Sequence, residues 1–316
     1  MRTGVSYMGH HNPKHMKSDM EDLKRLGCDD LLLAAQENDF AYMNGKLNFL
    51  PKIAKDRGMK PIVIFWGLLN LFGGGKSSQF LLGNPGAHQV CKDGSWHPEG
   101  CYNNPVCLEY TKQLISRTAQ MGFEGYFIDE PTGIDCYCPS CRRKFESMFS
   151  RPLEKALPEA VRNFRKKCVI DYIRDISEYT KNNHPQMETF CCLMPVDRAV
   201  WKDAAKVLTI DNLGTDIYWA NEDNDVDEMR PLIKELAGFC KKEGKKHHQW
   251  LQAWGVKKGK EERIRAQGRI LINEKPDALY VWAYEGQVGT NEACEDPVCA
   301  WEAVCEILKK AKEING

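Results

Sequence analysis

Two adjacent acids end the most strand-like segment of the chain. An apolar run from Gly125 to Ile128 is followed directly by Asp129 and Glu130, and then by Pro131. Two carboxyl groups this close do not both ionise without cost, so one can stay protonated as a general acid while the other orients a substrate. The alternative is a helix N-cap with an acidic first turn. The position at a strand end favours the catalytic interpretation.

Aromatic and polar residues follow the other strand-like runs of the chain. Sugars stack their C–H faces on aromatic rings, and their hydroxyl groups bind carboxylates, amides and imidazoles. A single aromatic residue more often contributes to packing, but the clustering of these residues at strand ends favours a carbohydrate ligand. The predicted substrate-binding residues are Tyr7, His10, His11, Glu37, Trp66, Tyr218, Trp219, Gln252, Trp254 and Trp282.

Hydrolysis of a glycoside typically uses two carboxyl groups. We expect Glu130 to be the acid/base residue, with Asp129 as its partner. Glu285 ranks first for the second carboxylate because it lies beside Trp282 and Tyr284. Asp216 ranks second because its side chain could point into the core of the protein, and Glu37 is a more distant candidate.

A cysteine cluster follows the acidic pair. Cys136, Cys138 and Cys141 form a C-x-C-x-x-C pattern, and a structural zinc ion needs four thiolate or imidazole ligands. We expect Cys101 to be the fourth ligand, with Cys91 next and Cys107 also within the preceding loop. A structural zinc ion here would pin this loop to the segment that carries the acidic pair. The alternative is a set of buried, reduced cysteines.

The elements that must position these residues alternate between strand and helix. Amphipathic helices are predicted between the strand-like runs, for example at His15–Leu26, Leu108–Met121 and Pro158–Asn182, which is the pattern of repeated βα units. We predict one (β/α)₈ barrel over residues 1–316, with a long irregular loop from Leu68 to Pro105 after the third strand. The predicted strands are Gly4–Met8, Asp30–Ala35, Pro61–Trp66, Gly125–Ile128, Glu188–Leu193, Asn212–Trp219, His248–Trp254 and Ala278–Tyr284.

The composition excludes several classes of function. Lys plus Arg and Asp plus Glu both number 44 among 316 residues, so no net charge favours nucleic acid. No apolar stretch is long enough to span a bilayer, and no apolar signal core follows the N-terminus. Fourteen cysteines in a large chain without a signal are expected to stay reduced or to bind metal, which favours a cytoplasmic protein.

From Gly4 to Phe145 the chain resembles glycoside hydrolase barrels, particularly the family 42 β-galactosidases and related glycosyl hydrolases of similar length. The residues that carry the resemblance are the acidic strand end, the Cys101-Tyr102-Asn103-Asn104-Pro105 loop and the segment from Cys136 to Phe145. The resemblance implies a zinc ion held by Cys101, Cys136, Cys138 and Cys141, and an acid/base role for Glu130.

The chain departs from that family at two positions. Asp129 stands where the family has Asn, and an Asp-Glu pair is instead similar to the family 20 hexosaminidases, where the aspartate orients an acetamido group. The family's nucleophile lies on the seventh strand, where this chain has Gln252 and no acid. The second carboxylate therefore lies on another strand, or the substrate supplies the nucleophile, or the activity is not hydrolysis.

The sequence as a whole predicts a hydrolase of O-glycosidic bonds with a carbohydrate substrate and a structural zinc ion. A carbohydrate-binding or regulatory barrel without activity is one alternative, and a sugar lyase or isomerase that uses the same carboxylates is another. We do not expect the extra domains that follow the family 42 barrel, so the resemblance predicts neither the substrate nor the oligomeric state, and a homo-oligomer is left as an alternative.

Overall fold

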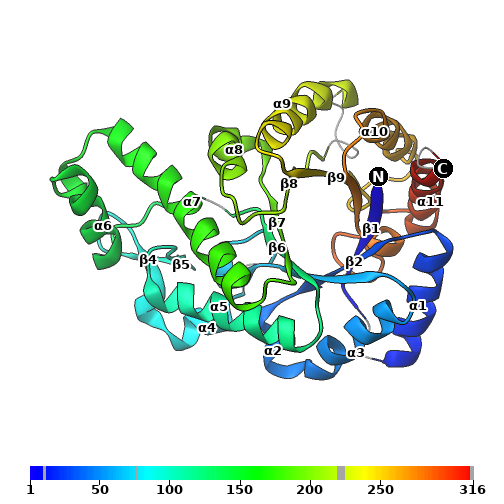
Figure 1. Ribbon diagram of the computed structural model, residues 1–316, viewed down its shortest axis with the longest axis horizontal. Coiled ribbons are helices and arrows are strands. Elements are labelled where there is room, and N and C mark those ends of the chain that lie inside the picture. Colours follow the sequence, from blue (N-terminus) through cyan, green and yellow to red (C-terminus); the bar gives the residue numbers. More distant parts are fainter. Residues whose placement is uncertain (10–11, 76, 132, 219–224, 314–316) are drawn as a thin grey trace.

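Eight parallel strands close into a barrel in the computed structural model, which describes residues 1–9, 12–75, 77–131, 133–218 and 225–313 (Figure 1). The order around the barrel is β1-β10-β9-β8-β7-β6-β3-β2, so each barrel strand pairs with its neighbours in the chain. The predicted (β/α)₈ barrel is confirmed. The barrel strands are β1 (Arg2–Tyr7), β2 (Asp30–Ala35), β3 (Lys60–Phe65), β6 (Gly125–Asp129), β7 (Glu188–Cys192), β8 (Asn212–Thr215), β9 (Lys246–Gln252) and β10 (Ala278–Trp282).

Helices cover the outside of the barrel, and several begin where the sequence places a cap. Asn12 and Asn104 each accept a hydrogen bond from a backbone N–H two residues ahead, and a proline follows each of them at the first helical position. The helices are α1 (Pro13–Arg25), α2 (Glu37–Tyr42), α3 (Asn44–Lys55), α4 (Gln79–Gly83), α5 (Pro105–Gln120), α6 (Pro139–Phe149), α7 (Pro158–Asn183), α8 (Arg198–Ala205), α9 (Met229–Lys242), α10 (Glu262–Asn273) and α11 (Pro297–Glu313).

The barrel interior is filled by large rings. Phe127 and Phe190 stack with their centroids 5.5 Å apart, and His248, Trp250 and Tyr280 pack around them. Position 214 in the barrel wall must be glycine to leave room for the His248 imidazole, because a Cβ there would lie 2.2 Å from that ring. The interior is therefore a packed core, and a ligand can bind only at its ends.

The long segment after β3 contains regular structure that the sequence analysis did not predict. It holds α4 and an antiparallel hairpin of β4 (His88–Val90) and β5 (Trp96–Gly100). Figure 1 shows this hairpin and α6 beside each other, outside the ring of barrel strands. Within the described residues no helix has the length and apolar character that crossing a bilayer requires.

Candidate active site

Three carboxylic acids meet at the carboxyl ends of β6 and β8. Asp129 is the last residue of β6, Glu130 follows it with a φ of 40°, and Asp216 follows the last residue of β8. The Glu130 N–H donates to the Cys192 carbonyl at the end of β7, 3.0 Å away, which holds the turn against the strand between them. All three acids line one cavity of about 480 Å³.

The acids interact strongly with one another. Burial, and then the charge of Glu130, raise the pKa of Asp129 well above its usual value. Burial also raises the pKa of Asp216, followed by a hydrogen bond with the Glu130 carboxyl and by the Glu130 charge. The Cys192 thiol also contacts Asp216, with Sγ 3.5 Å from Oδ1. Burial and the neighbouring carboxyl group therefore favour the protonated forms of Asp129 and Asp216, and a general acid must carry such a proton.

Aromatic rings form much of the cavity wall. The Trp66 and Trp282 ring centroids are 5.9 Å apart, and those of Tyr218 and Trp254 are 5.5 Å apart. Trp250 also lines the cavity, with its ring 6.0 Å from that of Trp282. The structure therefore brings Trp66, Tyr218, Trp254 and Trp282 together around the acids, as their positions at strand ends suggested.

A glycine-rich segment closes one side of the cavity. The Gly73 N–H donates to the Asp129 carbonyl over 3.0 Å, and a Cβ at Gly73 would lie 2.4 Å from Glu130 Oε2. Gly74 and Gly75 also line the cavity. Glycine is required at position 73 because the backbone approaches the Glu130 carboxylate this closely.

The Glu37 carboxylate anchors the residues on either side of this glycine-rich segment by hydrogen bonds. The buried Glu37 carboxylate accepts hydrogen bonds from the Leu69 N–H, the Ser78 hydroxyl and the Phe80 N–H, at 2.8–2.9 Å. It does not line the cavity. The structure thus places Glu37 as an anchor of the segment and not beside the three acids.

Glu285 lies apart from the acid cluster. It is exposed, in the turn Tyr284–Gln287 with a φ of 49°, and it lines a separate cavity of about 190 Å³ together with Tyr7. The Tyr7 hydroxyl donates to Asp19 over 2.5 Å, so Tyr7 belongs to this neighbouring cavity. Of the two carboxylates ranked for the second role, the structure brings Asp216, and not Glu285, to Glu130.

Other predicted positions have different surroundings. Gln252 is fully buried at the end of β9, and its side-chain amide donates to the Trp254 carbonyl over 3.0 Å. His10, His11 and Trp219 lie outside the described residues.

Sequence reasoning missed several residues at the cavity. Trp250 lies inside a strand and not at its end, although residues 250, 252 and 254 alternate on one face, which was the available signal. Met194 and Glu292 also line the cavity. Asp197, by contrast, is a polar residue that follows a predicted strand, and burial, followed by the Glu130 charge, raises its pKa.

The four predicted metal ligands do converge. The Sγ atoms of Cys101, Cys136, Cys138 and Cys141 lie within 4.8 Å of one another, and Cys101 is 3.4 Å from Cys141 and 3.7 Å from Cys138. Four thiolates around a zinc ion, each at about 2.3 Å, would be about 3.8 Å apart. The cluster can therefore hold a metal ion, and its donor set fits zinc.

Backbone and side-chain donors surround these sulfur atoms. The Val90 and Cys138 N–H groups point to Cys136 Sγ at 3.4 and 3.3 Å, and the Asn103 amide points to Cys141 Sγ at 3.2 Å. Such contacts stabilise thiolates and orient them. Because Val90 belongs to β4, the cluster ties the hairpin to the segment that follows the acid pair.

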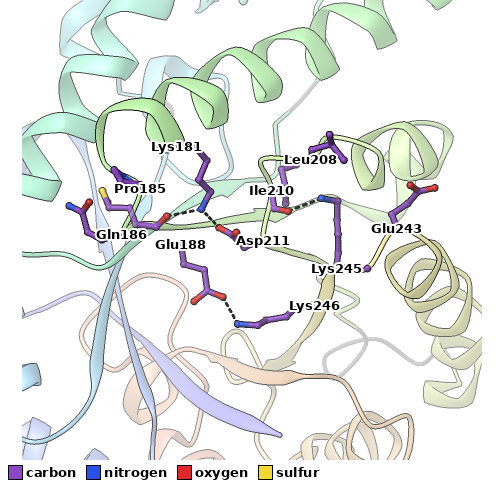
Figure 2. Close-up of a pocket in the computed structure, with 12 residues that line it drawn as sticks. Lys181, Pro185, Gln186, Glu188, Leu208, Ile210, Asp211, Glu243, Lys245 and Lys246 are labelled. Atoms are coloured by element: carbon purple, nitrogen blue, oxygen red, sulfur yellow. Dashed lines mark hydrogen bonds and ion pairs between the residues drawn. The ribbon is translucent and has the colours of Figure 1, made fainter.

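Another cavity, of about 450 Å³, lies at the opposite end of the barrel (Figure 2). Lys181 pairs with Asp211 at 2.5 Å, Lys246 pairs with Glu188 at 3.1 Å, and Lys245 donates to the Ile210 carbonyl at 2.7 Å. The lysines that line it all have partners, and the amino ends of barrel strands usually serve stability. We therefore place the candidate active site at the end that carries Glu130.

Comparison with known proteins gives the fold its context. No protein-family model matches the sequence, and no curated protein matches it significantly. A β-galactosidase from the Antarctic haloarchaeon Halorubrum lacusprofundi has a similar structure, with a TM-score of 0.73 and 14% identity over 99% of this chain and 58% of that chain. A catalytic mutant of a GH42 β-galactosidase from G. stearothermophilus gives a TM-score of 0.73 at 12% identity, over 100% and 57% of the two chains.

An endo-β-1,4-mannanase from Thermotoga petrophila is also similar, with a TM-score of 0.62 at 12% identity over 100% of this chain and 77% of that chain. This chain spans less than two thirds of the length of the β-galactosidases. At these identities the likeness establishes the fold alone. The chain has the TIM-barrel fold of the glycoside hydrolases, as its resemblance to the family 42 barrels implied.

Proposed function

We propose that the protein, over residues 1–316, is a glycoside hydrolase that cleaves an O-glycosidic bond by general acid/base catalysis. The observation that carries the proposal is the contact between the Glu130 and Asp216 carboxyl groups inside an aromatic cavity at the carboxyl end of the barrel. Glycoside hydrolysis needs such a carboxyl pair beside a sugar, and aromatic rings supply the stacking surface.

The residues take distinct roles in this proposal. When a sugar separates the pair, Glu130 keeps the proton that it shares with Asp216 in their hydrogen bond and protonates the leaving oxygen, and the ionised Asp216 is the second carboxylate, acting on the other side of the sugar ring. Asp129 orients a substrate group, and it ionises when positive charge develops beside it. Glu285 is a poorer candidate because it is exposed and lines a different cavity, and Gln252 cannot ionise.

The spacing of the two carboxyl groups has a mechanistic consequence. Carboxyl groups lie about 5 Å apart in retaining enzymes and farther apart in inverting ones. A sugar that enters between Glu130 and Asp216 interrupts their hydrogen bond and sets their separation. Proton NMR of the first-formed product would distinguish retention, with Asp216 as nucleophile, from inversion, with Asp216 as the base for water.

A panel of aryl glycosides in H₂¹⁸O tests the reaction type. We expect release of the phenol from at least one glycoside, with ¹⁸O in the sugar product. Loss of the phenol without ¹⁸O in the sugar would indicate a lyase, and a rearranged sugar that keeps the phenol would indicate an isomerase. Binding measured in parallel without release of phenol would indicate a carbohydrate-binding barrel. Any of these results would contradict the proposal.

We also propose that the ion at the cysteine cluster is a structural zinc ion. Elemental analysis of freshly purified protein should find one zinc per chain, and Cys141→Ser should lose it. The variant should unfold at a temperature several degrees lower, because structural zinc contributes directly to folding. Cys299→Ser, which changes an exposed cysteine outside the cluster, is the matched control and should keep the metal. Wild-type protein without a tightly bound metal would refute the assignment.

A further inference from the structure

Among the described residues, the ionisable groups of Asp and Glu, and none of Lys, Arg or His, line the candidate active site. Asp129, Glu130, Asp216 and Glu292 all line the cavity, and Asp197 lies near Glu130. None of the lining residues that the structure describes is Lys, Arg or His. A cavity that binds only neutral sugars has no need of this many acids without a compensating cation, since each buried carboxylate costs free energy.

The Asp129 carboxyl group is buried and lacks a hydrogen-bond donor from the part of the chain that the structure describes. Asp129 is 9% exposed, and burial and the charge of Glu130, with no donor, are the causes of its raised pKa. Buried polar groups are nearly always hydrogen-bonded, so a cavity-lining carboxyl without a donor indicates that a ligand supplies one. An ammonium group offers three donors and a positive charge at a single point.

The aromatic wall favours the same kind of ligand group. The faces of Trp and Tyr rings attract cations within about 6 Å of the ring centroid, and Trp is the strongest of these rings. Trp66, Trp250, Trp254, Trp282 and Tyr218 line the cavity beside the acids. Carboxylates and aromatic faces together stabilise a cation, whereas both repel an anionic group.

We propose that the cavity recognises a sugar that carries a free, protonated amino group, in preference to the corresponding neutral sugar, and excludes sugars that carry a carboxylate. The ammonium group contacts Asp129, and the aromatic rings stack on the rest of the sugar. As a statement about substrate, this inference rests on the proposed glycosidase function, but recognition of the amine is measurable without turnover.

Calorimetric binding to matched sugars tests the recognition directly. The probes are methyl thioglycosides, which resist hydrolysis, in both anomers and in the gluco and galacto series. Each series contains the free amine, the parent alcohol, the N-acetyl form and the uronic acid. We expect the amine to bind at least ten-fold more tightly than the alcohol and the N-acetyl form in one series, with no binding of the acid. Equal or tighter binding of the alcohol or the acid would overturn the inference, as would no binding of any probe.

Two variants assign the preference to a residue. Asp129→Asn should reduce the preference for the amine over the alcohol to less than three-fold, because the amide carries no charge. Glu285→Gln removes an acid from the neighbouring cavity and should leave the preference unchanged. A preference that survives Asp129→Asn would contradict the role of Asp129.

Lys76 provides a further control because it follows Gly75 in the chain and lies outside the described residues. Lys76→Met should keep the amine preference within about two-fold of wild type. A preference that appears only in this variant would mean that the lysine neutralises the acids in the wild-type protein, and it would overturn the inference.

The hydrolysis panel separates failure of this inference from failure of the proposed function. Hydrolysis of neutral glycosides without any preference for amines would support the function and refute the inference. Selective binding of amines without hydrolysis of any glycoside would support the inference and refute the function.

Discussion

At the scale of single residues, the acids of the cavity are held in an environment that disfavours their charged forms. Burial is the largest cause of the raised pKa of both Asp129 and Asp216. A group whose pKa is raised by folding destabilises the folded protein when it ionises, so its cost is absent at low pH and grows as the pH rises through the folded pKa. Sites built for catalysis commonly carry such a cost.

Asp216→Asn should therefore stabilise the protein at alkaline pH. The amide keeps the shape of the side chain and cannot ionise, so the thermal midpoint at pH 8 should rise by about 2–5 °C. At pH 3 the difference should fall below about 1 °C, because Asp216 is then largely protonated in both the folded and unfolded states. Thermal unfolding by circular dichroism across this pH range measures the effect. A variant that is less stable than wild type at pH 8 would contradict the assignment.

The sequence identified much of this cluster because strand ends were recognisable. Asp129, Glu130 and Asp216 were all named from their positions after apolar runs. Their order of importance was not predictable: Glu285 ranked above Asp216 because it follows aromatic residues. The left-handed backbone at Glu285 and its exposed side chain depend on the turn it occupies, which residue types alone do not specify.

At the scale of elements, the segment between β3 and α4 forms part of the site. The Glu37 carboxylate fixes it at Leu69, Ser78 and Phe80, and Gly73 lies against the Glu130 carboxylate. The sequence predicted a long irregular loop from Leu68 to Pro105, and the structure brings the glycine-rich part of that loop to the acids. Its anchoring could not be predicted, because Glu37 and Ser78 are 41 residues apart.

Gly73→Ala should displace Glu130 without unfolding the protein. The new methyl group would lie 2.4 Å from Glu130 Oε2 and 3.1 Å from Asp129 Oδ2, so the carboxylates must move. Overpacking of this kind costs about 1–3 kcal/mol. We expect the kcat for an aryl glycoside to fall at least ten-fold. Gly86→Ala is the matched control, because its Cβ meets nothing within 4 Å, and it should keep wild-type turnover. Equal rates for the two variants would argue against a close approach of this loop to the acids.

At the scale of the whole molecule, the two ends of the barrel have opposite electrostatic character. At the carboxyl end the acids lie together, whereas at the amino end Glu188 is surrounded by Lys60, Lys246 and Arg2, at 2.5, 3.1 and 3.4 Å. Although burial opposes it, the hydrogen bond and charge of Lys60 and then the charge of Lys246 lower the pKa of Glu188. The amino end therefore stabilises the fold, and the carboxyl end is free for chemistry.

Glu188→Gln should destabilise the barrel without affecting catalysis. A carboxylate whose pKa is lower in the folded than in the unfolded protein stabilises the folded state at pH values above its unfolded pKa. This contribution is lost as the pH falls through the folded pKa. We expect the free energy of unfolding to fall by about 1–3 kcal/mol at pH 7 and by less at pH 3.5. The value at pH 7 is modest because the lysine partners are partly exposed to solvent. Urea unfolding at both pH values measures it. An unchanged stability with a reduced kcat would reverse the roles of the two ends.

The barrel itself was predictable because eight apolar runs and the helices between them follow a regular rhythm. Each predicted strand agrees with an observed barrel strand to within a few residues, as for Asp30–Ala35, which agrees fully. The hairpin of β4 and β5 was missed because His88–Val90 is short and β5 contains Pro98 and is largely exposed, so neither strand shows an apolar run. The Val90 N–H contact with Cys136 Sγ joins this hairpin to the cysteine cluster.

The central claim is that Glu130 is the general acid, and the dependence of turnover on the leaving group tests it most directly. Glu130→Gln, with unchanged thermal unfolding as the check on folding, should reduce kcat/KM by about 10²–10⁴ for a glycoside with a poorly acidic phenol. For a dinitrophenyl glycoside, whose leaving group needs no proton, the loss should be at least ten-fold smaller, and Glu285→Gln should resemble wild type with both substrates. Equal losses for the two leaving groups, or no loss in the Glu130 variant, would contradict the account.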